Sequence, residues 1–142
     1  MIWCKAMNNS NISINKIKEE ADLNKYANYY FLMHYWMKNI EEGKNLDNFF
    51  ISRGYKKIAI YGTGALGMHL ETQLSEQFKP IYTVDQGIIQ YNGQSIPMKE
   101  AEDIVNKADV IVVTPVGDYE IIKTNINYKI DVISLEEIIL SL

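Results

Sequence analysis

The stretch that decides the fold is Lys57-Ile58-Ala59-Ile60-Tyr61-Gly62-Thr63-Gly64-Ala65-Leu66-Gly67. Its first residues are mostly apolar and predict a short buried strand. The glycines that follow have the spacing G-x-G-x-x-G, and the alanine and leucine among them favour the start of a helix. A strand, a glycine-rich turn and a helix in this order give that spacing a physical meaning.

The three glycines have separate expected roles. Gly62 permits the tight turn out of the strand, Gly64 lets backbone N–H groups approach a pyrophosphate, and Gly67 lets the helix pack closely on the strand. The first helical turn carries unpaired N–H groups and a partial positive charge that would face the anion. The expected phosphate-binding residues are therefore Gly62, Thr63, Gly64, Ala65, Leu66 and Gly67.

Three more residues are candidates for the same site. Asp85 lies 23 residues after Gly62, close to the ~20 expected of a carboxylate that accepts ribose hydroxyls. Thr114 and Pro115 follow a later apolar strand, at the sheet edge where open α/β sheets bind ligands. The alternatives stay open: a tight turn without a ligand, a solvated acid at a strand end, and a plain loop after the later strand.

Strands alternate with helices in the second part of the chain, which predicts an α/β fold with a Rossmann-like parallel sheet flanked by helices. About four strands are expected, from the apolar runs at 56–61, 81–84, 110–113 and 130–133. Asn92-Gly93 is a hairpin-turn signal. We expect a polar, partly disordered N-terminus over 1–14, an aromatic-rich helical extension over 15–54 and a nucleotide-binding domain over 55–142.

The helical extension carries a stripe of large apolar side chains at three- and four-residue steps. These are Tyr26, Tyr29, Tyr30, Met33, Trp36, Met37 and Ile40. Further apolar residues widen the stripe beyond one face, and a helix of that kind is usually covered on two sides. We therefore expect a homodimer through the helix at 26–40.

Composition excludes several classes of function. The net charge is −4 and Arg53 is the only arginine, which argues against nucleic-acid binding. Cys4 is the only cysteine, so we expect no internal disulfide and no metal site rich in cysteine. There is neither a signal-peptide pattern nor an apolar run long enough for a membrane span, so the expected location is the cytoplasm.

No residue is expected to be catalytic. Tyr119 and Lys123 match Y-x-x-x-K, the spacing of short-chain dehydrogenases, but the pair lies too early in the fold and lacks a well-placed serine. His34 and His69 have no nucleophile or metal cluster near them in sequence. The strand–helix series is also little more than half of a full dinucleotide fold, and no second domain is present to hold a substrate.

The glycine stretch resembles small Rossmann domains described as sugar-epimerase-like, from bacterial surface-polysaccharide biosynthesis. Val84-Asp85, the run 109–114 and the run 132–139 extend this resemblance, which covers about residues 25–142. The layout is also similar to the N-terminal domain of sugar acyltransferases, which binds a nucleotide sugar. The resemblance implies a nucleotide or nucleotide-sugar binder, with NAD or a nucleotide sugar as its ligand.

Three hypotheses follow. The first is a nucleotide or nucleotide-sugar binding module that assists a partner enzyme of glycan synthesis and has no catalysis of its own. The second is an NAD-dependent oxidoreductase or epimerase that is active only as an oligomer; Asp85 would favour NAD over NADP, because a carboxylate repels a 2′-phosphate. The third is a small S-adenosylmethionine-dependent methyltransferase. Size and the lack of catalytic groups favour the first.

Overall fold

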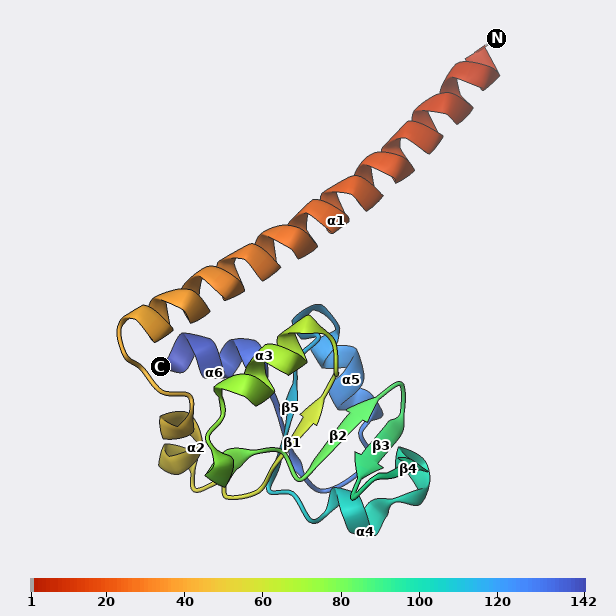
Figure 1. Ribbon diagram of the computed structural model, residues 1–142. Coiled ribbons are helices and arrows are strands. Elements are labelled where there is room, and N and C mark those ends of the chain that lie inside the picture. The colour runs from red at the N-terminus through yellow and green to blue at the C-terminus, as the bar shows by residue number, and fades with distance from the viewer. Residues whose placement is uncertain (1) are drawn as a thin grey trace. The chain divides into compact units, whose positions relative to one another are not determined.

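The computed structural model describes the backbone of residues 2–142 and the side chains of residues 14–142 (Figure 1). The polar N-terminus expected over 1–14 therefore lies almost wholly outside the described side chains. The chain forms two compact units, which divide between Met37 and Lys38.

The N-terminal helix of the predicted fold is confirmed as α1 (Ile2–Glu41). It ends at a glycine turn, where the N–H of Gly43 donates to the Ile40 carbonyl at 3.0 Å and the N–H of Lys44 donates to the Asn39 carbonyl at 2.8 Å. These bonds satisfy carbonyls of the last helical turn. Within the described part of the chain, neither this helix nor any other is apolar over enough of its length to cross a bilayer.

Over residues 2–142 the strands form one six-stranded sheet in the order β4-β3-β2-β1-β5-β6. They are β1 (Ile58–Tyr61), β2 (Tyr82–Asp85), β3 (Ile88–Tyr91), β4 (Gln94–Pro97), β5 (Val110–Val113) and β6 (Asp131–Ser134). The expected α/β class is confirmed, because β2, β1, β5 and β6 are parallel. The chain runs from β1 to β2 and later returns to the other side of β1 as β5. The topological switch point therefore lies between β1 and β5.

The expected count of about four strands is wrong, because a hairpin extends the sheet beyond β2. β3 pairs antiparallel with β2, and β4 pairs antiparallel with β3. The turn at Asn92-Gly93 joins β3 to β4, as the sequence predicts. A second tight turn joins β2 to β3, and its residues Gln86 and Gly87 both have positive φ, +49° and +74°. Because glutamine is uncommon in that conformation, this turn carries no recognisable hairpin signal.

Helices cover the sheet and connect its strands. Those of the second unit that follow α1 are α2 (Asp47–Arg53), α3 (Ala65–Gln73), α4 (Glu102–Val105), α5 (Tyr119–Asn125) and α6 (Leu135–Ser141). Ser134 caps α6, because its Oγ accepts the N–H of Glu136 at 3.2 Å.

The core lies on both faces of the parallel strands. Ala59, Tyr82 and Ile111 belong to one buried cluster, together with Val105 of α4. Side chains alternate along a strand, so the fully buried Ile58 points to the opposite face. With both faces of β1 and β5 buried, only the carboxyl edge of these strands can carry a ligand site between them.

Candidate functional site

Gly62 makes the tight turn at the carboxyl end of β1. Its φ is +105°, and a Cβ at this position would collide with the Thr114 hydroxyl and lie 2.7 Å from Cδ of Pro115. The Gly62 N–H donates to the Val84 carbonyl at 2.8 Å, which ties the loop to β2. Only glycine fits this backbone conformation and this space.

Thr114 and Pro115 pack against the glycine loop. Thr114 is buried, and its hydroxyl lies 3.1 Å from the carbonyl oxygens of both Tyr61 and Gly62, to which it donates. The Thr114 N–H also donates to the Tyr61 carbonyl at 2.9 Å. The structure therefore brings these two predicted site residues to the loop, in positions that hold the loop rather than face solvent.

Gly67 and Gly64 lie in opposite environments. A Cβ on Gly67 would collide with the carbonyl oxygen of Gly62, so α3 approaches the end of β1 as closely as backbone allows. A Cβ on Gly64 would meet no atom within 4 Å. The loop is thus tight at its first and third glycines and open at its second, which is the distribution of space that a dinucleotide-binding turn requires.

The N-terminal end of α3 has no cap of its own. Gly64 is the N-cap residue, no side chain bonds to this helix end, and the first turn contains no acidic residue. The Met68 N–H donates to the Gly64 carbonyl at 3.0 Å and so begins the helical ladder. The N–H groups of Ala65, Leu66 and Gly67 precede that bond, and they are the donors that an anion can use.

Asp85 lies beside the glycine loop. Its Oδ2 accepts a hydrogen bond of 2.5 Å from the hydroxyl of Thr63, and both side chains are exposed. Asp85 is the last residue of β2, and its register places it on the sheet face opposite Val84. The loop and the acid that the sequence assigns to one site are therefore in direct contact.

A cleft of about 720 Å³ lies at the same sheet edge. Two of the residues that line it, Tyr61 and Gln86, are next to Gly62 and Asp85 in the sequence. Its lining comes from the end of β1, the β2–β3 turn, the end of the hairpin and α5 with the segment after it. The lining residues are Tyr61, Gln86, Gly87, Ile88, Pro97, Met98, Lys99, Ile122, Asn125, Ile126, Asn127 and Tyr128. Sequence reasoning missed this cleft, because it depends on the hairpin that folds back through the Met98 N–H, which donates to the Gly87 carbonyl at 2.8 Å.

The Tyr119 and Lys123 pair is engaged in structural contacts. The Tyr119 hydroxyl donates to the Val132 carbonyl at 2.9 Å, and the Lys123 ammonium lies 5.6 Å from the centre of the Tyr119 ring. Among the described side chains, no three His, Cys, Asp or Glu residues gather closely enough to hold a metal ion.

The clearest pKa shifts lie at the amino edge of the sheet, opposite the glycine loop. Burial, followed by the hydrogen bond to Asp131, raises the pKa of Tyr55 to about 12. The N–H groups of Lys57 and Lys56 lower the pKa of Asp109. Both residues stand where strands begin, so these shifts belong to the packing of the sheet.

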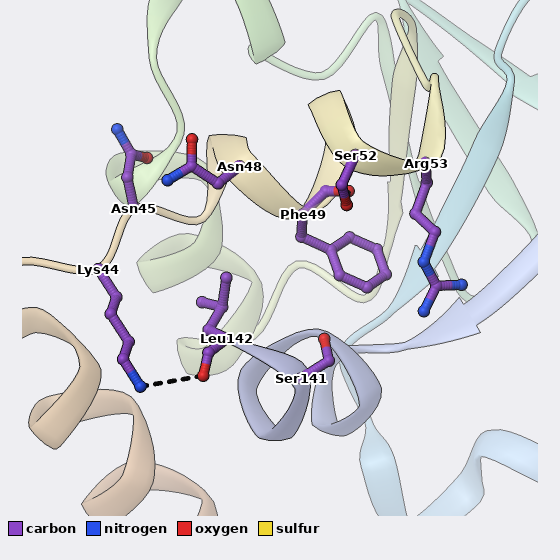
Figure 2. Close-up of a pocket in the computed structure, with 8 residues that line it drawn as sticks. All are labelled: Lys44, Asn45, Asn48, Phe49, Ser52, Arg53, Ser141 and Leu142. Atoms are coloured by element: carbon purple, nitrogen blue, oxygen red, sulfur yellow. Dashed lines mark hydrogen bonds between the residues drawn. The ribbon is translucent and has the colours of Figure 1, made fainter.

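A smaller cavity of about 380 Å³ opens between α2 and α6 (Figure 2). Two cations line it, and both have partners. The Lys44 ammonium donates to the Leu142 carbonyl at 3.0 Å and lies 3.2 Å from a Glu42 carboxylate oxygen. Arg53 lies 3.7 Å from Glu137. With each cation facing an acid, the cavity has no surplus of positive charge to attract an anion.

The fold and the site define a class: an α/β protein with a glycine-rich loop at the switch point of its sheet and an acid at the end of the neighbouring strand β2. Comparison with known proteins finds no matching family model, no matching curated protein and no matching solved structure. The function is therefore argued from the geometry of the site.

Proposed function

We propose that this chain is a nucleotide or nucleotide-sugar binding module. The observation that carries the proposal is the contrast between the glycines: Gly62 and Gly67 admit no side chain, whereas Gly64 stands open at an uncapped helix end. A diphosphate placed against Gly64 would accept hydrogen bonds from the first N–H groups of α3 and would benefit from the helix dipole.

The neighbouring acid supports a ribose on the same ligand. The Asp85 carboxylate is an acceptor, and the two hydroxyls of a ribose are the donors that suit it. Its contact with Thr63 holds it beside the phosphate loop. A carboxylate here favours NAD over NADP, because it would repel a 2′-phosphate.

The cleft of about 720 Å³ offers space for the base. It begins at Tyr61 and Gln86, the residues next to Gly62 and Asp85 in the sequence. Its lining is mainly apolar with a few polar groups, as is usual for small-molecule sites. In this proposal the loop holds the phosphates, Asp85 holds the ribose, and the cleft is the candidate site for the base.

The proposal includes a supporting role beside a partner enzyme of bacterial polysaccharide synthesis, in the cytoplasm, with no catalysis by this chain alone. That part rests on the resemblance to sugar-epimerase-like domains. The engagement of the Tyr119 hydroxyl with a main-chain carbonyl supports a non-catalytic role. NAD and nucleotide sugars share the diphosphate and ribose that the site would recognise.

A melting panel tests the proposal. The full chain is heated alone and with NAD, NADP, a UDP-sugar, S-adenosylmethionine or inorganic pyrophosphate. A ligand at 100 times its Kd should stabilise the fold by about 2.7 kcal/mol and raise the Tm by several degrees. Gly64→Ala should reduce that rise to about half or less, since a Kd raised ~10-fold leaves about 1.4 kcal/mol of stabilisation at the same ligand concentration. Melting curves that do not change with any of these compounds would contradict the proposal, and a rise with S-adenosylmethionine alone would favour a methyltransferase instead.

A further inference from the structure

The helix α1 carries an apolar seam along its described length. Its members are Leu23, Tyr26, Tyr30, Met33, Met37 and Ile40, at alternating steps of three and four residues. Five of them are between 44% and 70% exposed, and Met33 is half-buried. Steps of three and four repeat every seven residues, and this is the a/d pattern of a two-stranded coiled coil.

A second stripe on α1 accounts for the other apolar residues of the helix. Leu32, Trp36 and Asn39 also follow one another at steps of four and three, and all three are buried. The exposed seam is offset from that stripe by about one residue, or roughly 100° around the helix. The two stripes are therefore different faces, and burial of one leaves the other uncovered.

The helix needs a covering surface for its own stability. Every side chain from residue 14 to residue 28 is exposed. Helices in water depend mainly on the packing of an apolar face, and this segment has several asparagines, which favour helices weakly.

We infer that a second copy of this chain covers the seam by pairing its own α1 with this helix. Large side chains carry about 150–250 Å² each, so six of them at these exposures offer roughly 600–700 Å² per copy. That approaches the ~800 Å² per partner of a standard interface. A seam with coiled-coil spacing along its length is complementary to itself, which makes an identical helix the best-fitting partner.

Sedimentation of the full chain without nucleotide tests the pairing, independently of any ligand. The native chain should be a dimer at micromolar concentration. Tyr30→Glu, in the seam, should weaken dimerisation at least ~30-fold, as expected for a hot-spot loss of about 2 kcal/mol. Tyr35→Glu is the matched control, since Tyr35 is also exposed on α1 but lies away from the seam, and it should remain a dimer.

A monomeric native chain, a dimer that survives Tyr30→Glu, or binding of a monomer to lipid vesicles would overturn the inference. Leu23→Cys in a Cys4→Ser background determines the orientation of the pair: a disulfide-linked dimer on mild oxidation identifies a parallel pair, because antiparallel pairing separates the two copies of residue 23 by about 25 Å, at 1.5 Å of helix per residue.

Discussion

Gly67 in the first turn of α3 packs directly on the main chain of Gly62, so that any Cβ at residue 67 would collide with the Gly62 carbonyl oxygen. This contact joins the helix to the end of β1 and leaves Gly64, between them, projecting into open space. The same short loop therefore combines the most restrictive and the least restrictive backbone positions of the site. A side chain at residue 67 should therefore lower stability, whereas a side chain at residue 64 should weaken binding.

Gly67→Ala should destabilise the fold without any ligand present. The methyl group meets backbone rather than a movable side chain, and overpacking of this kind costs about 3 kcal/mol, or a fall of roughly 10 °C in Tm. Gly64→Ala is the matched variant. The backbone conformation of residue 64 suits alanine, so the free energy of unfolding should change by less than about 1 kcal/mol. Nucleotide binding should weaken at least ~10-fold. Thermal melting and calorimetric titration measure the two effects, and equal loss of stability in both variants would contradict this division of roles.

Asp85→Asn should weaken nucleotide binding about 10-fold and narrow the preference for NAD over NADP. The amide keeps an acceptor for the Thr63 hydroxyl but removes the negative charge that binds ribose hydroxyls and repels a 2′-phosphate. Because Asp85 is exposed, the Tm of the free protein should barely change. Glu102→Gln removes an exposed charge elsewhere and serves as the control. Unchanged affinities for both dinucleotides would show that Asp85 does not touch the ligand.

The sequence predicts the centre of this fold well and its edge poorly. The strand, glycine turn and helix around residues 57–67 are encoded locally, because each element follows from residues next to one another. The assignment of Asp85 to the site follows from its spacing after Gly62, whereas its hydrogen bond to Thr63 is seen only in the structure. The hairpin and its cleft depend on Gln86 adopting a positive φ, which packing imposes against the preference of the residue.

Gln86 should therefore be a site of stored strain. Gln86→Asn or Gln86→Gly should raise the stability of the free protein by about 0.5–1 kcal/mol, because both residues adopt positive φ more readily than glutamine. Gln94→Asn, in β4, lacks that conformation and should be neutral or slightly destabilising. Urea denaturation of the three variants makes the comparison. A loss of stability in both Gln86 variants would mean that side-chain contacts of Gln86 outweigh its backbone strain.

Asp109 should make the stability of the sheet depend on pH in the acid range. Its Oδ2 accepts the N–H groups of Lys56 at 2.8 Å and Lys57 at 2.9 Å, and these bonds hold its pKa below the ordinary 3.8. The unfolded chain therefore binds the proton more readily, so this contribution to stability is complete above the ordinary pKa. It is lost as the pH falls through the folded value.

Asp109→Asn should accordingly lower the free energy of unfolding by about 1 kcal/mol at pH 7, a modest figure because the carboxylate is exposed. The difference from the native chain should shrink as the pH approaches 3. Glu71→Gln, an exposed acid on α3, should show no such dependence. Urea denaturation at pH 7, 5 and 3 measures the difference in the free energy of unfolding between each variant and the native chain. A difference for Asp109→Asn that stays constant across this range would show that Asp109 is not the source of the pH dependence.

Tyr119→Phe distinguishes a binding module from an oxidoreductase. The hydroxyl donates to the Val132 carbonyl at 2.9 Å, so its removal should cost about 1 kcal/mol of stability and leave nucleotide affinity unchanged. Lys123→Met, which removes the cation over the same ring, should also bind nucleotide normally. Affinity is measured by calorimetry, and turnover by absorbance of NADH with a nucleotide-sugar substrate. Turnover in the native chain that disappears in Tyr119→Phe would establish a catalytic tyrosine and replace the binding-module proposal with the dehydrogenase alternative.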